Sequence, residues 1–159
     1  MPVRYRTNVC IVIRKKGSRR VLLCHRKGHP HDSGWQFPQG GIDDTADLFF
    51  EMKRELKEEI GTDAVAVLAV SRKKYAYKFP ADALKSRPGF GGQIQQWVLV
   101  ELLLDESSIH FNHKPAEFDA FKWATARAAL REIVDFKKPT YLKAMTDLGL
   151  IKKNHHKVK

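Results

Sequence analysis

A cluster of glutamates between residues 51 and 60 is the feature of this chain best suited to chemistry. Glu55, Glu58 and Glu59 lie three or four positions apart or side by side. On a helix, residues with that spacing bring their Cβ atoms to within roughly 5–6 Å of one another. Because Mg²⁺ and Mn²⁺ prefer carboxylate oxygen, the spacing predicts a divalent metal site. The alternative is a solvated acidic face balanced by lysines.

Apolar periodicity predicts the helix that would carry these glutamates, over about residues 46–60. Four apolar residues recur at helical spacing and would form its buried stripe: Phe49, Met52, Leu56 and Ile60. Asp44 or Thr45 is expected to cap the start of the helix, and Gly61 to end it.

A turn-forming run, Pro38-Gln39-Gly40-Gly41, precedes the helix and lets the backbone approach a ligand closely. Turn and helix together resemble the signature of the Nudix hydrolases. That pattern runs Gly, five residues, Glu, seven residues, Arg-Glu, an apolar residue, any residue, Glu-Glu, any residue, Gly. The corresponding positions here are Gly40, Ala46, Arg54-Glu55-Leu56, Glu58-Glu59 and Gly61.

Ala46 is the one departure from this pattern, because it stands where the family has its first Glu. In the family that Glu mainly supports the following Arg rather than holding metal. The departure therefore concerns the bracing of Arg54 more than catalysis. Asp43, Asp44 and Asp47 are the candidates to substitute for it.

Further residue groups resemble, in chain order, the bacterial RNA pyrophosphohydrolases within the Nudix group. Their relatives include enzymes that cleave diadenosine polyphosphates. The resemblance extends to about residue 147. It rests on Tyr5-Arg6-x-Asn8-Val9, Trp35-Gln36-Phe37-Pro38-Gln39-Gly40-Gly41, Gly92-Gln93-x-Gln95-x-Trp97, Pro115-x-Glu117-Phe118 and Phe136-Lys137.

The resemblance implies which residues form the site. Mg²⁺, with Mn²⁺ as the alternative ion, would be held by Glu55, Glu58, Glu59 and Glu117 and by the backbone at Gln39 and Gly40. The residues implied in catalysis are Arg54, Glu58, Glu59 and Glu117. We expect Glu59 or Glu117 to accept the proton of the attacking water. The implied RNA-binding residues are Arg6, Arg26, Gln93, Phe136 and Lys137.

Phe136 and its neighbour Asp135 leave two points open. Phe136 either stacks on a base of the RNA or packs between the two helices that end the chain. A carboxylate at Asp135 would repel phosphate unless it points away or pairs with a lysine.

The expected reaction converts 5′-triphosphate or 5′-diphosphate RNA to 5′-monophosphate RNA, a step that would trigger mRNA decay. Metal ions would neutralise the phosphate charge and lower the pKa of bound water. A dinucleoside polyphosphate hydrolase of the diadenosine tetraphosphate type, or a nucleotide pyrophosphohydrolase, would use the same residues. A non-catalytic RNA or nucleotide sensor is the alternative of another class, and only Ala46 favours it.

The overall charge agrees with an anionic partner, since 29 Lys and Arg outnumber 18 Asp and Glu and give a net charge of +11. The 159 residues, 43% of them hydrophobic, fit one globular domain over 1–159 with a basic, frayed tail at 152–159. Cys10 and Cys24 lack metal-ligand spacing and are expected to be buried free thiols. No signal peptide or membrane span is predicted, so a cytoplasmic protein without membrane partners is expected.

Apolar runs and breaker residues predict strands over 3–14, 20–26, 64–78, 93–104 and 118–123, the third being one long strand or a bent pair. They predict helices over 125–132 and 139–148. Loops are predicted over 27–34, with His29 and His31 exposed, over 80–92, which is expected to be mobile, and over 105–116.

The segment 72–78 alternates basic and aromatic residues, which fits either a phosphate-facing surface or a solvated strand. Strands around one strong helix, followed by closing helices, predict an α/β fold with a mixed β-sheet. The Nudix resemblance implies that this fold is an α/β/α sandwich.

Overall fold

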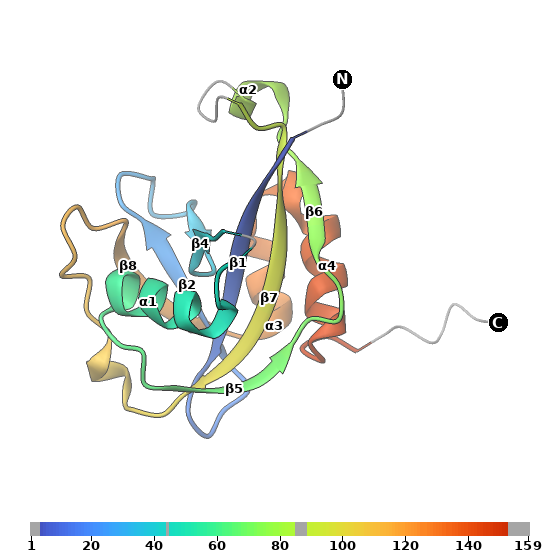
Figure 1. The fold of residues 1–159 in the computed structure, drawn as a ribbon. Helices are drawn as coiled ribbons and strands as arrows, with labels where there is room; N and C mark the ends of the chain where they lie inside the picture. The colour runs from blue at the N-terminus through green and yellow to red at the C-terminus, as the bar shows by residue number, and fades with distance from the viewer. Residues whose placement is uncertain (1–3, 44, 85–88, 153–159) are drawn as a thin grey trace.

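A mixed β-sheet forms the middle layer of the molecule (Figure 1). The computed structural model describes residues 4–43, 45–84 and 89–152. Within these ranges one sheet contains eight strands: β1 (Tyr5–Arg14), β2 (Val21–Arg26), β3 (Trp35–Gln36), β4 (Gln39–Gly41), β5 (Val65–Val70), β6 (Tyr75–Lys78), β7 (Gly92–Leu102) and β8 (Phe118–Ala124). The helices are α1 (Leu48–Ile60), α2 (Ala81–Leu84), α3 (Ala126–Glu132) and α4 (Lys138–Asp147), with 3₁₀ turns η1 (Glu106–Ser108) and η2 (Asp135–Lys137).

The sheet is organised around β1 and β7, which pair in parallel over the whole of β1. β1 also pairs antiparallel with β2 and β4. β2 in turn carries β3 and β8, and β7 carries β5 and β6, all antiparallel. The mixed sheet predicted from the sequence is therefore confirmed.

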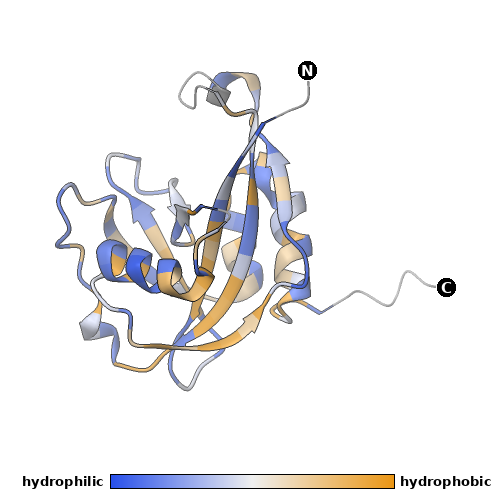
Figure 2. Ribbon diagram, in the orientation of Figure 1, coloured by the Kyte–Doolittle hydropathy of each residue, from blue (hydrophilic) through white to orange (hydrophobic). Residues whose placement is uncertain are grey.

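Helices cover both faces of this sheet, which gives the α/β/α sandwich that was expected. The central part of β1 is fully buried because it packs on both sides, as near-continuous apolar strands do. One core contains Met52, Leu56 and Ile60 of α1. The opposite core contains Tyr141 and Met145 of α4. Figure 2 shows hydrophobic residues along β5 and much of β7.

The helix predicted to carry the glutamates exists, and its start differs from the prediction. Asp47 is the N-cap, and its carboxylate accepts a hydrogen bond from the Phe50 N–H at 3.0 Å. Thr45 does not cap the helix, because its N–H and hydroxyl both donate to the Asp43 carboxylate at 2.9 Å. Asp44 lies outside the described residues. Gly61 ends the helix at φ 80°, in the left-handed region that glycine favours.

Phe49 is the wrong member of the predicted apolar stripe, since 44% of its surface is exposed. Leu48 packs against the core in its place. The buried stripe therefore repeats every four residues from Leu48, and Met52, Leu56 and Ile60 are confirmed. Phe49 lies one position, about 100° of helix rotation, away from that line.

Most other predicted elements are found within one or two residues of their expected ends. The stretch 64–78 is a bent pair, β5 and β6. The predicted loops over 80–92 and 105–116 contain α2 and η1, respectively. Residues 85–88 and the tail from 153 onward lie outside the described ranges.

Both cysteines are free and buried, as expected. His29 and His31 lie in an exposed loop, also as expected. No helix in the described ranges is long and apolar enough to cross a membrane.

Candidate active site

A cavity of about 510 Å³ gathers most of the residues expected to act. Its wall contains ten of them: Arg6, Arg26, Gln39, Gly40, Glu55, Glu58, Glu59, Gln93, Glu117 and Lys137. Arg54 and Phe136 are not part of this wall. Five further residues line it that the sequence did not single out as site residues: Asn8, Gln36, Gly41, His113 and Pro115.

The acidic side of this cavity is formed by α1 and by the segment before β8. Glu117 is held in place by its backbone carbonyl, which accepts a hydrogen bond from the Lys27 N–H at 2.8 Å. Burial raises the pKa of Glu55. Burial, followed by repulsion from Glu117, Glu55 and Glu58, raises the pKa of Glu59 to about 7. Crowded carboxylates of this kind are disfavoured unless a cation balances them.

The turn at Gln39 and Gly40 lies directly against these carboxylates. β4 pairs with β1 there, so that Val9 lies opposite Gly40. A Cβ atom on Gly40 would overlap the carboxylate of Glu55. The backbone of the turn is thus in contact with a candidate ligand, as a shared coordination site requires.

The donor set fits a hard divalent cation, because carboxylate and backbone oxygens are the ligands that such ions prefer. Across residues 4–43, 45–84 and 89–152, no three His, Cys, Asp or Glu side chains converge closely enough to hold a metal ion. The four glutamates line one cavity without closing on one point. Two of them, Glu55 and Glu58, are instead paired with Arg54.

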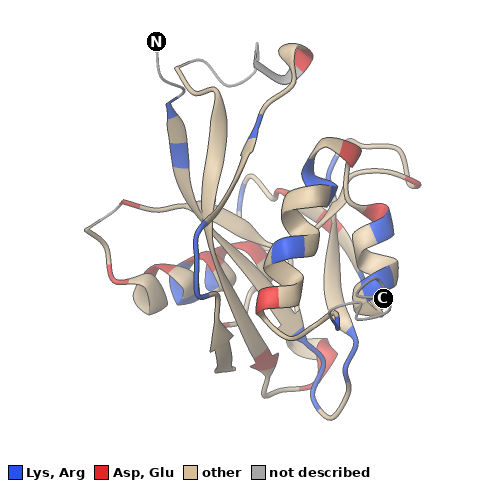
Figure 3. Cartoon of the chain, turned by 90° about the vertical axis from the view of Figure 1, so that its right-hand side faces the viewer, with Lys and Arg blue, Asp and Glu red and all other residues tan. Residues whose placement is uncertain are grey.

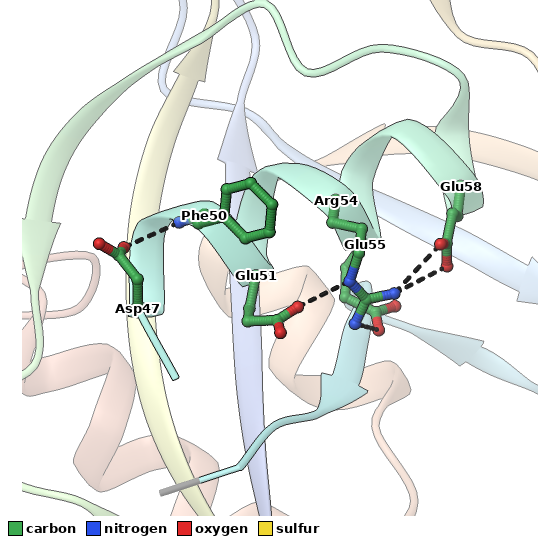
Figure 4. Close-up of polar contacts among 6 residues, drawn as sticks. All are labelled: Asp47, Phe50, Glu51, Arg54, Glu55 and Glu58. Carbon is green, nitrogen blue, oxygen red and sulfur yellow. Dashed lines mark hydrogen bonds and ion pairs between the residues drawn. The ribbon is translucent and has the colours of Figure 1, made fainter. Parts of the chain in front are cut away.

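Arg54 lies on α1 and braces the acidic residues of the helix (Figure 4). Its Nε donates to Glu51 at 2.6 Å, and its Nη atoms donate to Glu58 at 3.1 Å and to Glu55 at 3.3 Å. Asp43 and Asp47 were suggested from the sequence as substitutes for the missing Glu that braces Arg54, and both suggestions were wrong. Asp47 instead caps the helix, and Asp43 accepts hydrogen bonds from Thr45.

The opposite side of the cavity is basic. Arg6 of β1 lies beside Gln93 of β7 in the parallel pairing of the two strands. A Cβ atom on Gly41 would lie 2.6 Å from an Nη atom of Arg6, so the guanidinium rests on that glycine. Figure 3 shows basic residues spread over strands and helices, while several acidic ones gather on α1. An anion in the cavity would face Arg6, Arg26 and Lys137.

A buried amide network supports the turn, and the sequence reasoning missed it. The Gln95 side chain donates to Asn8 at 3.0 Å and to Gln39 at 3.2 Å. Gln93 donates to the Tyr77 hydroxyl at 2.8 Å, while its buried Oε1 has no hydrogen-bond partner among the described residues. Polar residues within otherwise apolar strands were the available signal.

Phe136 lines a second cavity of about 480 Å³ that shares Arg26, Gln36 and Lys137 with the first. Its ring also lies 5.8 Å from that of Tyr77 and packs against the core. The half-buried ring therefore packs against the core and also lines a cavity, and stacking on an RNA base stays a prediction. Asp135 is 95% exposed and pairs with Lys138 at 3.0 Å. Pairing with a lysine was one of the two ways in which this carboxylate would avoid repelling phosphate.

The loop beside this second cavity is fastened by His25. Its Nδ1 lies 2.6 Å from the Asp119 carboxylate, and its Nε2 lies 2.9 Å from the Pro30 carbonyl. An imidazole satisfies two acceptors only when both nitrogens carry protons. Hydrogen bonds to Pro30 and to Asp119 accordingly raise the pKa of His25, despite its burial.

The basic and aromatic segment 72–78 takes no part in the first cavity. Tyr77 is buried in the core, and the Tyr75 hydroxyl donates to Asp147 at 2.6 Å. Lys74 and Lys78 are exposed, as both a solvated strand and a phosphate-facing surface require, so the two alternatives stay open.

Comparison with known proteins places this arrangement in a known context. The model of the NUDIX domain matches residues 4–144. The RNA pyrophosphohydrolase of Histophilus somni is 41% identical over 151 residues, which cover 92% of this chain and 77% of that protein. The RNA pyrophosphohydrolase of Pasteurella multocida is 40% identical over 153 residues, which cover 92% of this chain and 75% of that protein.

Solved structures share the fold at lower sequence identity. The E. coli dihydroneopterin triphosphate pyrophosphohydrolase has a TM-score of 0.67 at 22% identity, covering 88% of this chain and 96% of that one. A C. elegans Ap4A hydrolase has a TM-score of 0.60 at 18% identity, covering 92% of this chain and 99% of that one. At these identities the likeness concerns the fold alone.

Proposed function

Because this chain belongs to the NUDIX domain family, we propose that it is a metal-dependent RNA pyrophosphohydrolase that converts 5′-triphosphate or 5′-diphosphate RNA to 5′-monophosphate RNA. Such a conversion would trigger mRNA decay in the cytoplasm. The relatives named RNA pyrophosphohydrolase, about 40% identical over 92% of the chain, support the choice of RNA. Residues 1–159 would form one Nudix domain.

The observation that carries the proposal is a single cavity with an acidic side and a basic side. Glu55, Glu58, Glu59 and Glu117 would hold Mg²⁺ or Mn²⁺ together with the backbone at Gln39 and Gly40. The bound ion would neutralise the anhydride oxygens and lower the pKa of a bound water. Arg6, Arg26 and Lys137 would bind the phosphates through charge-assisted hydrogen bonds.

A glutamate on the cavity wall would accept the proton of the attacking water. Glu59 and Glu117 are the preferred acceptors of the proton of the attacking water, because both line the cavity and repel each other. Arg54 is not part of the cavity wall, so its part in catalysis would be indirect, through its ion pairs with Glu55 and Glu58.

The second cavity would receive the first bases of the RNA. It adjoins the first through Arg26, Gln36 and Lys137, and its wall includes Trp35, Ile133, Val134 and Phe136. A base stacked there would keep the polyphosphate directed at the carboxylates. Gln93 lines the first cavity, and its buried Oε1, which no described residue pairs with, would accept a hydrogen bond from a hydroxyl or amino group of the RNA end.

The test is a comparison of turnover on triphosphorylated RNA and on diadenosine tetraphosphate, each with Mg²⁺. Phosphate or pyrophosphate release from RNA, with kcat/KM well above that for the dinucleotide, is expected. The reverse preference would make the protein a dinucleoside polyphosphate hydrolase. Binding of RNA without release of either product would make it a sensor.

A further inference from the structure

Glu51 is an acidic residue of α1 that takes no part in the wall of the first cavity. It lies three residues before Arg54 and seven before Glu58, so all three share one face of the helix. Its contact with Arg54 Nε, at 2.6 Å, is the shortest that the guanidinium makes. It is therefore placed to control Arg54 without touching metal or substrate.

We propose that Glu51 is a positioning residue, which holds Arg54 back so that Glu55 and Glu58 stay available to a divalent cation. The inference rests on the proposed function and concerns the same site. It also accounts for Ala46, which stands where the Nudix pattern has the carboxylate that supports this arginine. Ala46 lies before the helix, where its N–H donates to the Asp43 carbonyl at 3.0 Å.

The distances carry this inference. Arg54 is anchored at Nε, which leaves contacts of 3.1–3.3 Å to Glu58 and Glu55. Hydrogen bonds between charged groups are typically shorter, about 2.7–2.9 Å. A guanidinium freed from Glu51 would close on Glu55 and Glu58 and compete with the cation for the same oxygens.

The position of Glu55 makes it sensitive to such a change. Its side chain is only 12% exposed, against 37% for Glu58 and 40% for Arg54. Its carboxylate also lies directly against Gly40, where a Cβ atom would overlap it. A partly buried ligand cannot turn away from a guanidinium that closes on it, so the arginine must be restrained by something else.

The experiment is a double-mutant cycle read by Mn²⁺ binding, measured by calorimetry on folded protein without RNA. Glu51→Ala should weaken Mn²⁺ binding by about 10-fold, because the freed Arg54 would compete for the oxygens of Glu55 and Glu58; changes around metal ligands act on this scale. Arg54→Ala should change it little, and adding Glu51→Ala to Arg54→Ala should cost nothing further. Melting temperatures report whether each variant folds.

Glu51→Gln is the matched control, because it removes the charge and keeps an acceptor for Arg54 Nε. It should retain most of the affinity. Equal losses in Glu51→Gln and Glu51→Ala, or a loss from Glu51→Ala that persists undiminished without Arg54, would overturn the inference. So would wild-type protein that binds no Mn²⁺.

The proposed function can fail separately. Wild-type protein that binds Mn²⁺ and turns over no RNA would refute the RNA reaction, and the binding cycle would still decide the role of Glu51. If RNA is turned over, Glu51→Ala should raise the Mg²⁺ concentration needed for half-maximal rate and leave the KM for RNA unchanged.

Discussion

Gly40 and Glu55 are in such close contact that a methyl group on the glycine would occupy the space of the carboxylate. The two residues come from different elements, β4 and α1. This contact is the point at which the sheet and the acidic helix meet in the cavity. A substitution at Gly40 therefore acts on a candidate ligand directly.

Gly40→Ala should lower kcat by at least about 10-fold, the scale on which displaced metal-site partners act. The three atoms nearest the added Cβ belong to the Glu55 carboxylate, so the substitution acts first on that side chain, and the melting temperature reports whether the variant folds. Gly41→Ala is the matched control, since its Cβ would displace Arg6 instead. It should raise the KM for RNA and leave Mn²⁺ binding intact. Identical kinetic profiles for the two variants would contradict this division.

Glu58→Gln and Glu59→Gln should each reduce turnover by at least ~10²-fold, as removal of one electrostatic stabiliser does. Both variants should fold, because the loss of a carboxylate relieves repulsion. Steady-state rates at saturating Mg²⁺ provide the measurement. Near-normal rates in both variants would remove these residues from the reaction.

Glu59 also predicts a pH effect on the metal-free protein. Its pKa is raised from 4.5 to about 7 in the folded state, so folded protein binds more protons than unfolded protein between these values. Stability should therefore fall as the pH rises from about 4.5 to 7. With EDTA present, Glu59→Gln should melt higher than wild type at pH 8 and no higher at pH 4. A constant difference at both pH values would be incompatible with this origin.

Phe136→Ala should raise the KM for triphosphorylated RNA by roughly ten-fold or more, since stacking contributes about 1–3 kcal/mol per base. It should have little effect on a substrate that presents only a short polyphosphate. Glu117→Gln should do the reverse and cut kcat on both substrates. If Phe136→Ala melts far below wild type and slows both substrates equally, the ring serves the core through Tyr77 instead.

Asp119→Asn should lower the melting temperature more at pH 6 than at pH 9. The folded pKa of His25 is raised above 6.5, so its charged hydrogen bonds contribute fully below that pH and are lost as the pH rises through the folded value. Asp63→Asn, at an exposed site on another loop, is the control. Equal shifts at both pH values would show that the imidazolium is not involved.

The sequence predicted the features that depend on local spacing. The α1 helix, its end at Gly61 and the buried line of Met52, Leu56 and Ile60 follow from periodicity alone. The start of the helix does not follow from periodicity, because Asp43, Asp47 and Thr45 can all act as caps. Which of them caps the helix depends on the contacts of the folded chain.

Contacts between distant residues were beyond such reasoning. The pairing of His25 with Asp119 joins residues 94 positions apart. The amides of Asn8, Gln39 and Gln95 meet only because β1 pairs with β4 and β7 in one particular register. The family pattern placed most of the cavity wall in advance, whereas Glu51 required the geometry of the arginine it holds.

The parallel pairing of β1 with β7 has a consequence for synthesis of the protein. Asn8 and Gln95 are 87 residues apart, and closing so large a loop costs entropy before any contact forms. The cavity wall then continues to Lys137, beyond β8, the last strand in the described ranges. At ribosomal rates of about 5–20 residues per second, on the order of 10 s separates the emergence of Arg6 from that of Lys137. The growing chain thus carries Arg6, Arg26 and the acidic helix before Glu117 and Lys137 have been made, and a phosphate held between the two sides of the cavity would lack its contact with Lys137 until that residue emerges.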